Sequence, residues 1–516
     1  MPPASTPSPS STPAIIPPAA SSPLPVLSPD VISVVKSTAP VLAAQGPHIT
    51  QAFYPLLFSR YPAVQELFNK RNQAPEPDGT PARQPQALAN AVWAYAANID
   101  NLSALSAAVS LIAHKHASLH VLPEHYPMVG ECLLAAIAQV LGPEVATEEV
   151  LKAWGQAYGF LAAVFVQTED GLRASNARKR HGWTGWKTMR VARKVMESED
   201  VASFYLSNVQ DGEPVCAFLP GQYISLRLTL PNGEVEERDY SLSEFAVPAS
   251  AHALELGGKA RSAEEEGGKK ECKGEGRGEE GKEEGDCPPY FRISIKRLPG
   301  GAVSAYMHDK VEEGSEILVG PPYGDFVLAP PSTPSSSPSS HPRPLVLLSA
   351  GIGITPLLCM AEAALLGTPS QESKEHRPSF PSSLSPRVFF LHTARDAAHF
   401  PFAARLASLA ARHPTRFACH VSFTQGSVEG GAEGGKEGKV RWGIGRLTAS
   451  ALHEALGGKV RPQDCSFYFC GPAGYMVSVR RLLTWLGVPA EEVKYECFGP
   501  ASAEVEAAGV VPSSFS

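Results

Sequence analysis

The side chains of this sequence best placed to bind a metal are three histidines in the segment Leu111–Tyr126, namely His114, His116 and His120. A helix turns by about 100° per residue, so His114 and His116 would point about 200° apart, whereas His116 and His120 share a face. Three interpretations follow: surface histidines without a ligand, a zinc site built on the second pair, or one axial ligand of a haem. Zinc is disfavoured because no carboxylate or cysteine stands at a usual ligand spacing nearby. The histidines alone do not decide between the other two.

A helix is expected to carry these histidines, because apolar residues recur before and after them at three- and four-residue steps. They are Leu102, Leu105, Val109, Ile112 and Leu119. Helical periodicity extends over residues 27–170, which are rich in Ala and Leu and poor in Gly. We therefore expect an all-α domain over this range.

Short motifs spread over this helical domain resemble the globin domain of the flavohaemoglobins. They are Phe53–Tyr54, Leu67–Asn69, Tyr95–Ile99, His114–His116, His125–Tyr126, Val129–Glu131, Ala153–Gly155 and Ala157–Gly159. The resemblance covers nearly the whole domain and implies that His116 is the proximal iron ligand of a haem b.

On the proximal side the resemblance implies catalytic roles for Glu169 and Tyr126. Glu169 would accept a hydrogen bond from the second ring nitrogen of His116, with Tyr126 beside it. Such a carboxylate makes the imidazole a stronger electron donor to iron, which favours O₂ activation over reversible O₂ carriage.

On the distal side the resemblance implies that Tyr54 and a glutamine donate hydrogen bonds to bound O₂, while Leu88 closes the haem pocket. A charged oxygen ligand gains about 1.5–3 kcal/mol from such a donor. Gln84 stands one helical turn before Leu88 and is the expected glutamine. Gln86 is the alternative, because the chain between Asn72 and Leu88 is longer than the family pattern.

Residues 183–328 contain short β-rich runs separated by turn signals, which predicts an antiparallel barrel. Pro220–Tyr223, Arg238–Ser241 and Gly300–Ser304 resemble motifs of the ferredoxin-reductase type of flavin domain. The resemblance implies that the second motif lines the isoalloxazine and meets the phosphates, and that the third aims backbone N–H groups at the pyrophosphate. The implied FAD-binding residues are Tyr223, Arg238, Tyr240, Ser241, Gly300, Gly301, Val303 and Ser304.

Residues 344–500 alternate strands with helices, which predicts a parallel sheet that binds ligands at the carboxyl ends of its strands. Ala350–Pro356 resembles the NAD(P)H pyrophosphate turn of ferredoxin reductases rather than a full Rossmann fingerprint, because a proline replaces its third glycine. Tyr468–Pro472 resembles the segment that lies against the nicotinamide, and Tyr495–Pro500 resembles the flavohaemoglobin ending, whose phenylalanine covers the flavin. The implied cofactor-binding residues are Gly351, Gly353, Thr355, Pro356, Cys470, Gly471, Pro472 and Phe498.

Composition sets the remaining expectations. The chain has 516 residues, which is enough for about three domains. Its net charge of −7 gives no reason to expect nucleic acid or an anionic membrane as a partner, and its 9 scattered cysteines favour a reducing compartment. We expect a cytoplasmic monomer with a disordered tail over residues 1–26, a solvated insert over 248–287 and a short tail over 501–516.

The order globin, flavin barrel, nucleotide domain implies nitric oxide dioxygenation. Electrons would pass from NADH or NADPH through FAD to the haem, where NO and O₂ are converted to nitrate. The alternatives are an NAD(P)H-dependent flavohaem reductase of other acceptors and a haem-based gas sensor. The sequence does not decide between NADH and NADPH.

Overall fold

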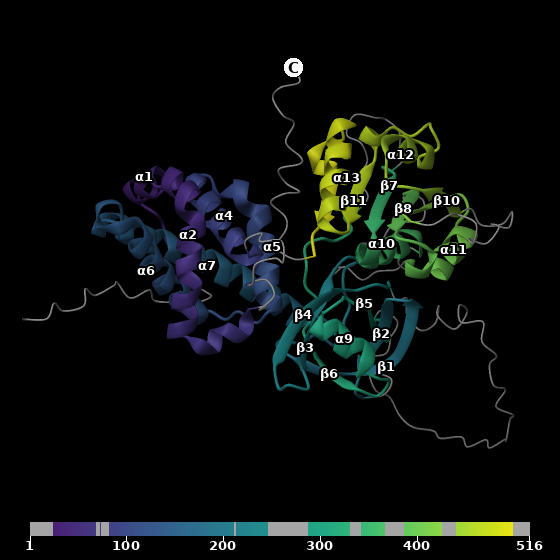
Figure 1. Ribbon diagram of the computed structural model, residues 1–516, viewed down its shortest axis with the longest axis horizontal. Helices are drawn as coiled ribbons and strands as arrows, with labels where there is room; N and C mark the ends of the chain where they lie inside the picture. Colours follow the sequence, from purple (N-terminus) through teal and green to yellow (C-terminus); the bar gives the residue numbers. More distant parts are fainter. Residues whose placement is uncertain are drawn as a thin grey trace, which may run out of the picture.

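The computed structural model describes residues 24–68, 73, 82–210, 213–245, 287–330, 342–366, 386–425 and 440–498. The two expected tails and the expected insert lie outside this part of the chain, apart from residues 24–26 and 287. Figure 1 shows a helical domain on the left, a β-barrel below and an α/β domain at the upper right. The expected fold class, an all-α globin followed by an antiparallel barrel and a parallel-sheet domain, is confirmed.

The first domain consists of helices. They are α1 (Pro29–Ser37), α2 (Ala39–Arg60), η1 (Pro62–Leu67), α4 (Arg83–Ala97), η2 (Leu102–Leu105), α5 (Ser106–Ser118), α6 (His125–Val145) and α7 (Glu148–Arg178). The helix expected to begin at Leu102 starts with a separate 3₁₀ turn before α5. Helix α7 begins where the Thr147 side chain accepts a hydrogen bond from the Val150 N–H, and it extends beyond the expected domain end at residue 170.

Helix α6 is the one described helix that is long and apolar enough, by length and composition, to cross a membrane. It packs against α2 and α7, and its buried residues, which include Leu133 and Ile137, belong to the core of the helical domain. We interpret α6 as a core helix.

The second domain is a barrel of six antiparallel strands. They are β1 (Lys187–Ser198), β2 (Val201–Asn208), β3 (Tyr223–Thr229), β4 (Val235–Ser241), β5 (Phe291–Lys296) and β6 (Glu316–Val319), in the order β4-β3-β6-β1-β2-β5. A bridge between Leu242 and Ile293 joins the two ends of this order and closes the barrel. Helix α9 (Ala302–Asp309) packs its Val303 and Met307 into the barrel core.

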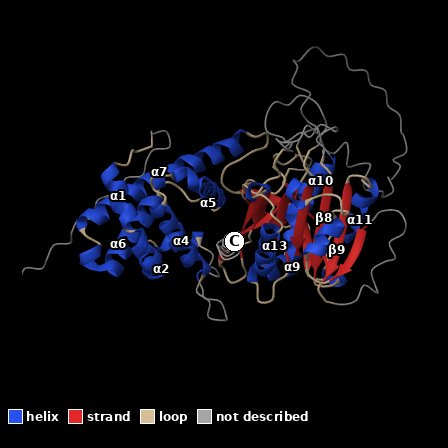
Figure 2. Ribbon diagram, turned by 90° about the horizontal axis from the view of Figure 1, so that it is seen from above, coloured by secondary structure: helices blue, strands red, loops and turns tan. Residues whose placement is uncertain are grey.

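The third domain has a six-stranded parallel sheet. The strands are β7 (Leu345–Ala350), β8 (Val388–Ala394), β9 (Phe417–Phe423), β10 (Val440–Ile444), β11 (Ser466–Cys470) and β12 (Val493–Glu496), in the order β10-β9-β8-β7-β11-β12. Helices α10 (Ile354–Leu366) and α11 (Ala403–Arg412) cover one face, and α12 (Ala449–Ala455) and α13 (Ala473–Trp485) cover the other. Figure 2 shows helices on either side of these strands. Strands β10 and β12 were not expected from the sequence.

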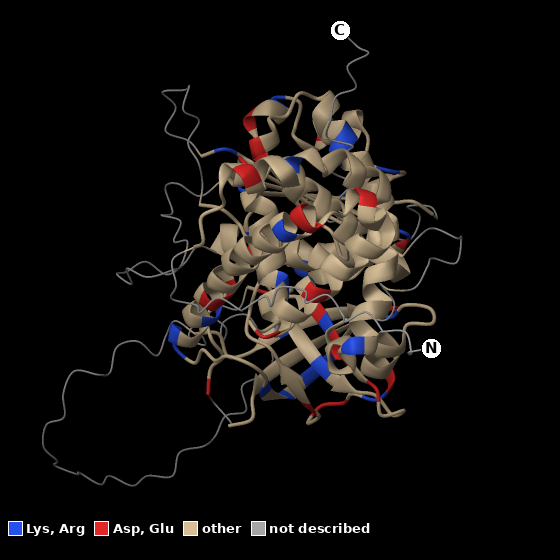
Figure 3. Ribbon diagram, turned by 90° about the vertical axis from the view of Figure 1, so that its left-hand side faces the viewer, with Lys and Arg blue, Asp and Glu red and all other residues tan. Residues whose placement is uncertain are grey.

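Acidic and basic residues lie interspersed on the side of the molecule that Figure 3 shows. Such mixing favours local ion pairs over a field of a single sign.

Candidate functional site

His116 lies on α5 and is held from one side by two residues of neighbouring helices. Its Nδ1 lies 2.9 Å from Oε1 of Glu169 on α7 and 3.1 Å from the hydroxyl of Tyr126 on α6. The Tyr126 hydroxyl also donates to Oε1 of Glu169 over 2.5 Å. The structure therefore brings together the three residues that the sequence proposed for the proximal side.

Burial and a neighbouring charge keep the Tyr126 hydroxyl of this cluster protonated. Burial, together with the Glu169 carboxylate beside it, raises the pKa of Tyr126, so its hydroxyl stays protonated and donates. Glu169 is fully buried, and Nη2 of Arg173, one turn later on α7, reaches its second oxygen at 3.2 Å. A carboxylate with these partners accepts a hydrogen bond from the Nδ1–H of His116, which leaves Nε2 with its lone pair for a metal.

Among the described residues, no three His, Cys, Asp or Glu side chains form a group that could hold a metal ion. A metal at His116 therefore needs a prosthetic group to supply its other ligands. A haem fits this residue, because its side chain is 32% exposed although its partner Glu169 is fully buried.

The distal residues are joined by a residue that sequence reasoning missed. Burial raises the pKa of Tyr54 on α2, and the Gln73 side chain hydrogen-bonds to its hydroxyl and partly offsets that rise. The same Gln73 amide donates to Oε1 of Gln84, at the start of α4, over 2.8 Å. Gln73 lies in the stretch that is longer than the family pattern, so no motif pointed to it.

The two glutamines proposed for the distal side have different surroundings. Gln84 is partly buried and bonded to Gln73, whereas Gln86 is exposed and donates to Oδ1 of Asn90 over 3.0 Å. Leu88 packs against the core of the helical domain. The geometry favours Gln84, which stays a prediction.

The helix that carries His116 docks directly on the flavin barrel. Lys115 pairs with Asp239 of β4, and its ammonium lies 5.6 Å from the centre of the Tyr223 ring on β3. Ala117 packs in one cluster with Tyr223 and Tyr323. The residues on both sides of His116 thus contact the barrel.

Two other histidines of the segment also serve this interface. Nδ1 of His114 accepts a hydrogen bond from the backbone N–H of Gly324 over 3.0 Å. His120 follows α5 with a left-handed φ of 56°, and its ring stacks on Trp186 with the ring centres 4.4 Å apart. These contacts give both residues a structural role, although His120 shares a helix face with His116 in the sequence pattern.

Strands β3 and β4 carry the four proposed flavin-binding residues before the glycine motif. Tyr223 and Ser241 face each other in the register of the two strands, and both are buried. Burial raises the pKa of Tyr240. Nη1 of Arg238 donates to Glu236 over 2.8 Å, so its contact with flavin phosphates stays a prediction.

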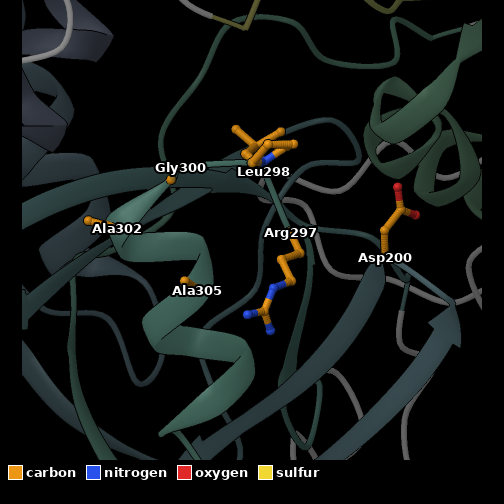
Figure 4. Close-up of a pocket in the computed structure, with 8 residues that line it drawn as sticks. Asp200, Arg297, Leu298, Gly300, Ala302 and Ala305 are labelled. Atoms are coloured by element: carbon orange, nitrogen blue, oxygen red, sulfur yellow. The ribbon is translucent and has the colours of Figure 1, made fainter.

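Gly300, Gly301 and Ala302 of the third flavin motif line a cavity of about 460 Å³ at the start of α9. Val303 packs into the barrel core and the Ser304 hydroxyl donates to the Gly301 carbonyl, so neither of these two residues lines the cavity. Figure 4 shows Gly300 and Ala302 beside this cavity, with Arg297 and Asp200 close by. A Cβ on Gly301 would lie 2.6 Å from Oγ of Ser304, so a larger residue would force the Ser304 side chain to move. The cavity and the helix start together suit a phosphate group.

The two turns proposed to bind the nucleotide meet at the carboxyl ends of β7 and β11. A Cβ on Gly353 would lie 2.4 Å from the carbonyl of Cys470 and 2.6 Å from the nitrogen of Gly471. The Thr355 hydroxyl donates to the Ile352 carbonyl and tightens the first turn. Pro356 is buried, whereas Pro472 is exposed.

Strand β12 brings Glu496 toward the barrel. Phe498 follows the strand and is 44% exposed, and its position over the flavin ring stays a prediction. Burial raises the pKa of Glu496 to about 8, Lys115 lowers it, and Ser241 is its hydrogen-bond partner. Sequence reasoning missed Glu496, although it lies within the quoted motif Tyr495–Pro500.

The comparisons with known proteins agree with this arrangement. A globin family model matches residues 51–165. A flavohemoprotein of Pseudomonas putida is 37% identical over 91% of this chain and 98% of its own length, and one of Pseudomonas aeruginosa is 38% identical over the same shares. The crystal structure of a Malassezia yamatoensis flavohemoglobin with bound FAD and heme matches 92% of this chain and all of its own, with a TM-score of 0.65 and 23% identity.

Proposed function

Because this chain belongs to the flavohemoprotein family, an NAD(P)H-dependent oxidoreductase family, we propose that it is a nitric oxide dioxygenase that converts NO and O₂ to nitrate. The observation that carries the proposal is the docking of α5. One helix would present His116 to a haem, and it places the neighbours Lys115 and Ala117 against the barrel. The globin is therefore built as the electron acceptor of the reductase attached to it.

The proposal assigns haem b, FAD and NADH or NADPH as cofactors. When bound, FAD takes two electrons from the nicotinamide and releases them singly, and the haem iron takes them one at a time and binds O₂. His116 would hold the iron through Nε2, and Glu169 and Tyr126 fix the orientation of its ring through Nδ1. The carboxylate strengthens the imidazole as a donor and favours oxygen activation.

The distal residues supply hydrogen-bond donors to the oxygen ligand. Gln73 donates both to the Tyr54 oxygen and to the Gln84 carbonyl oxygen. This leaves the Tyr54 O–H and the Gln84 amide N–H with their hydrogens available for a ligand. A site that only passes electrons to an external acceptor has no need of such donors.

The reductase residues hold the donor cofactors against the globin. The Gly300–Gly301 turn and the start of α9 would bind the FAD pyrophosphate, and Tyr240 and Ser241 would line its ring. The facing turns at Gly353 and Cys470 would bind NAD(P)H. We further propose that the protein acts as a monomer in the cytoplasm.

The test is anaerobic reduction of the purified, cofactor-loaded protein with NADH, followed by mixing with O₂ and NO while the haem Soret band is monitored. We expect NADH oxidation in air to accelerate when NO is added, with nitrate as the product. Equal NADH consumption with and without NO would overturn the dioxygenase assignment. Fast reduction of ferric salts or hydroperoxides without an effect of NO would support the reductase alternative instead.

A further inference from the structure

A buried cluster of five charged side chains joins the flavin barrel to the nucleotide domain. Arg405, on α11, is at its centre: its Nε lies 2.6 Å from Oε1 of Glu362 on α10, and its Nη2 lies 2.9 Å from Oε1 of Glu244 in the barrel. One guanidinium thus pairs with a carboxylate of each domain.

Arg292 extends the cluster from the barrel side. This β5 residue pairs with Glu197 of β1 at 2.6 Å and with the second oxygen of Glu244 at 3.3 Å. Its guanidinium also stacks over the ring of Phe402, just before α11, at 4.9 Å. The contact between Arg292 and Phe402 is therefore a second connection between the two domains, beside the pair of Arg405 and Glu244.

Most of the cluster is shielded from solvent, although the side chain of Arg405 at its centre is 26% exposed. Glu244, Glu362 and Arg292 are each less than 5% exposed. Three carboxyl groups face two guanidinium groups, and burial raises the pKa of Glu362. Buried ion pairs add little net stability over apolar packing, but they do demand one geometry, because each charge must keep its partner.

The cluster connects the two cofactor-binding elements. Glu244 follows Ser241, the last residue of the proposed flavin motif on β4, by three residues. Glu362 lies on α10, which begins at the proposed nucleotide turn, and its second oxygen accepts a hydrogen bond from the Phe245 N–H over 2.9 Å. A shift of α10 against β4 would break these bonds.

We propose that Arg405 is a positioning residue for hydride transfer, which fixes the nucleotide-binding helix α10 against the flavin strand β4 by pairing with Glu362 and Glu244 together. The inference rests on the reductase part of the proposed function. In that step a hydride leaves C4 of the nicotinamide and bonds to N5 of the flavin, so NAD(P)H loses two electrons and the flavin gains them. Misplacement of such reactants by about 1 Å can cost about a hundredfold in rate.

The test uses full-length, cofactor-loaded Arg405→Met, which keeps an unbranched apolar stem but removes the guanidinium group and its charge. Anaerobic stopped-flow reduction by NADH at several concentrations separates the apparent NADH Kd from the limiting rate of flavin reduction. We expect the limiting rate to fall about tenfold or more, with less than about a threefold change in Kd. In Arg405→Lys the lysine ammonium can reach only one of the two carboxylates. The limiting rate of flavin reduction in this variant should therefore lie between those of Arg405→Met and the wild type.

Two further variants separate positioning from loss of fold. Arg405→Met with Glu362→Gln removes the unpaired buried charge, so its thermal unfolding midpoint should return toward that of the wild type while its limiting rate stays low. Arg461→Met is the matched control, because Arg461 pairs with Asp464 on the surface of the same domain. It should reduce flavin at the wild-type rate.

Hydrogen exchange gives a readout that is independent of activity. Amides of residues 243–245 and of α11 should exchange faster in Arg405→Met than in Arg461→Met. An unchanged limiting rate in Arg405→Met, or a loss confined to Kd, would overturn the proposal. If the wild type reduces its flavin with NADH but does not consume NO, the dioxygenase proposal fails and the role of Arg405 stands.

Discussion

Replacement of Glu169 by glutamine tests the link between the proximal cluster and the chemistry of the iron. The carboxylate accepts bonds from His116, Tyr126 and Arg173, and it is fully buried. A hydrogen bond to a charged acceptor contributes about 1.5–3 kcal/mol and one to a neutral acceptor about 0.5–1.5 kcal/mol. The substitution therefore weakens the bond to His116 by about 1 kcal/mol.

This energy can be converted into a haem potential. A negative charge behind the imidazole stabilises the ferric state more than the ferrous state. Since about 1.4 kcal/mol corresponds to about 59 mV for one electron, the haem midpoint potential of Glu169→Gln should rise by about 40 mV. Spectroelectrochemical titration of the Soret band measures this shift.

A matched control and a clear refutation are available. Glu149→Gln removes a carboxylate from the exposed start of the same helix and should leave the potential unchanged. If Glu169→Gln has the same haem potential as Glu149→Gln, the carboxylate does not act on the iron through His116. Its buried hydrogen bonds would then serve the stability of the domain alone.

Four further results are expected. Tyr54→Phe should speed O₂ dissociation from the reduced protein by about tenfold to a hundredfold, because a hydrogen-bond donor worth about 1.5–3 kcal/mol is lost. Stopped-flow with a CO trap measures this rate, and an unchanged rate would show that Tyr54 does not contact the ligand. Gln73→Ala should also raise this rate, whereas Gln86→Ala should not, and the opposite order would reject Gln73 as the residue that orients the donors. His116→Ala should lose the Soret band but keep flavin reduction by NADH; loss of both would contradict separate haem and flavin sites. Since the folded protein binds the Glu496 proton more tightly than the unfolded chain, this carboxyl should lower the free energy of unfolding as pH rises from about 4.5 to about 8, and Glu496→Gln should flatten that decline in denaturant titrations.

Local patterns in the sequence determined the order of the three domains and the identity of most candidate residues. The motifs at His116, Arg238–Ser241 and Ala350–Pro356 are each only a few residues long, because a ligand bond or a tight turn needs particular residue types at fixed spacing. The short β-rich runs over residues 183–328 predicted the antiparallel strands that form the barrel. Strand β12 was missed because its short run carries polar residues and pairs only with β11.

Only the tertiary structure decided which of these residues act together. Gln73 belongs to no recognisable sequence motif, and its side chain donates a hydrogen bond to Gln84, which stands 11 residues later in the chain. Glu244, Glu362 and Arg405 look like ordinary charged residues in the sequence, because their pairing depends on contacts between segments more than 40 residues apart. Spacing along a chain fixes which side chains share a helix or a turn, whereas burial and partners are set by the packing of distant elements.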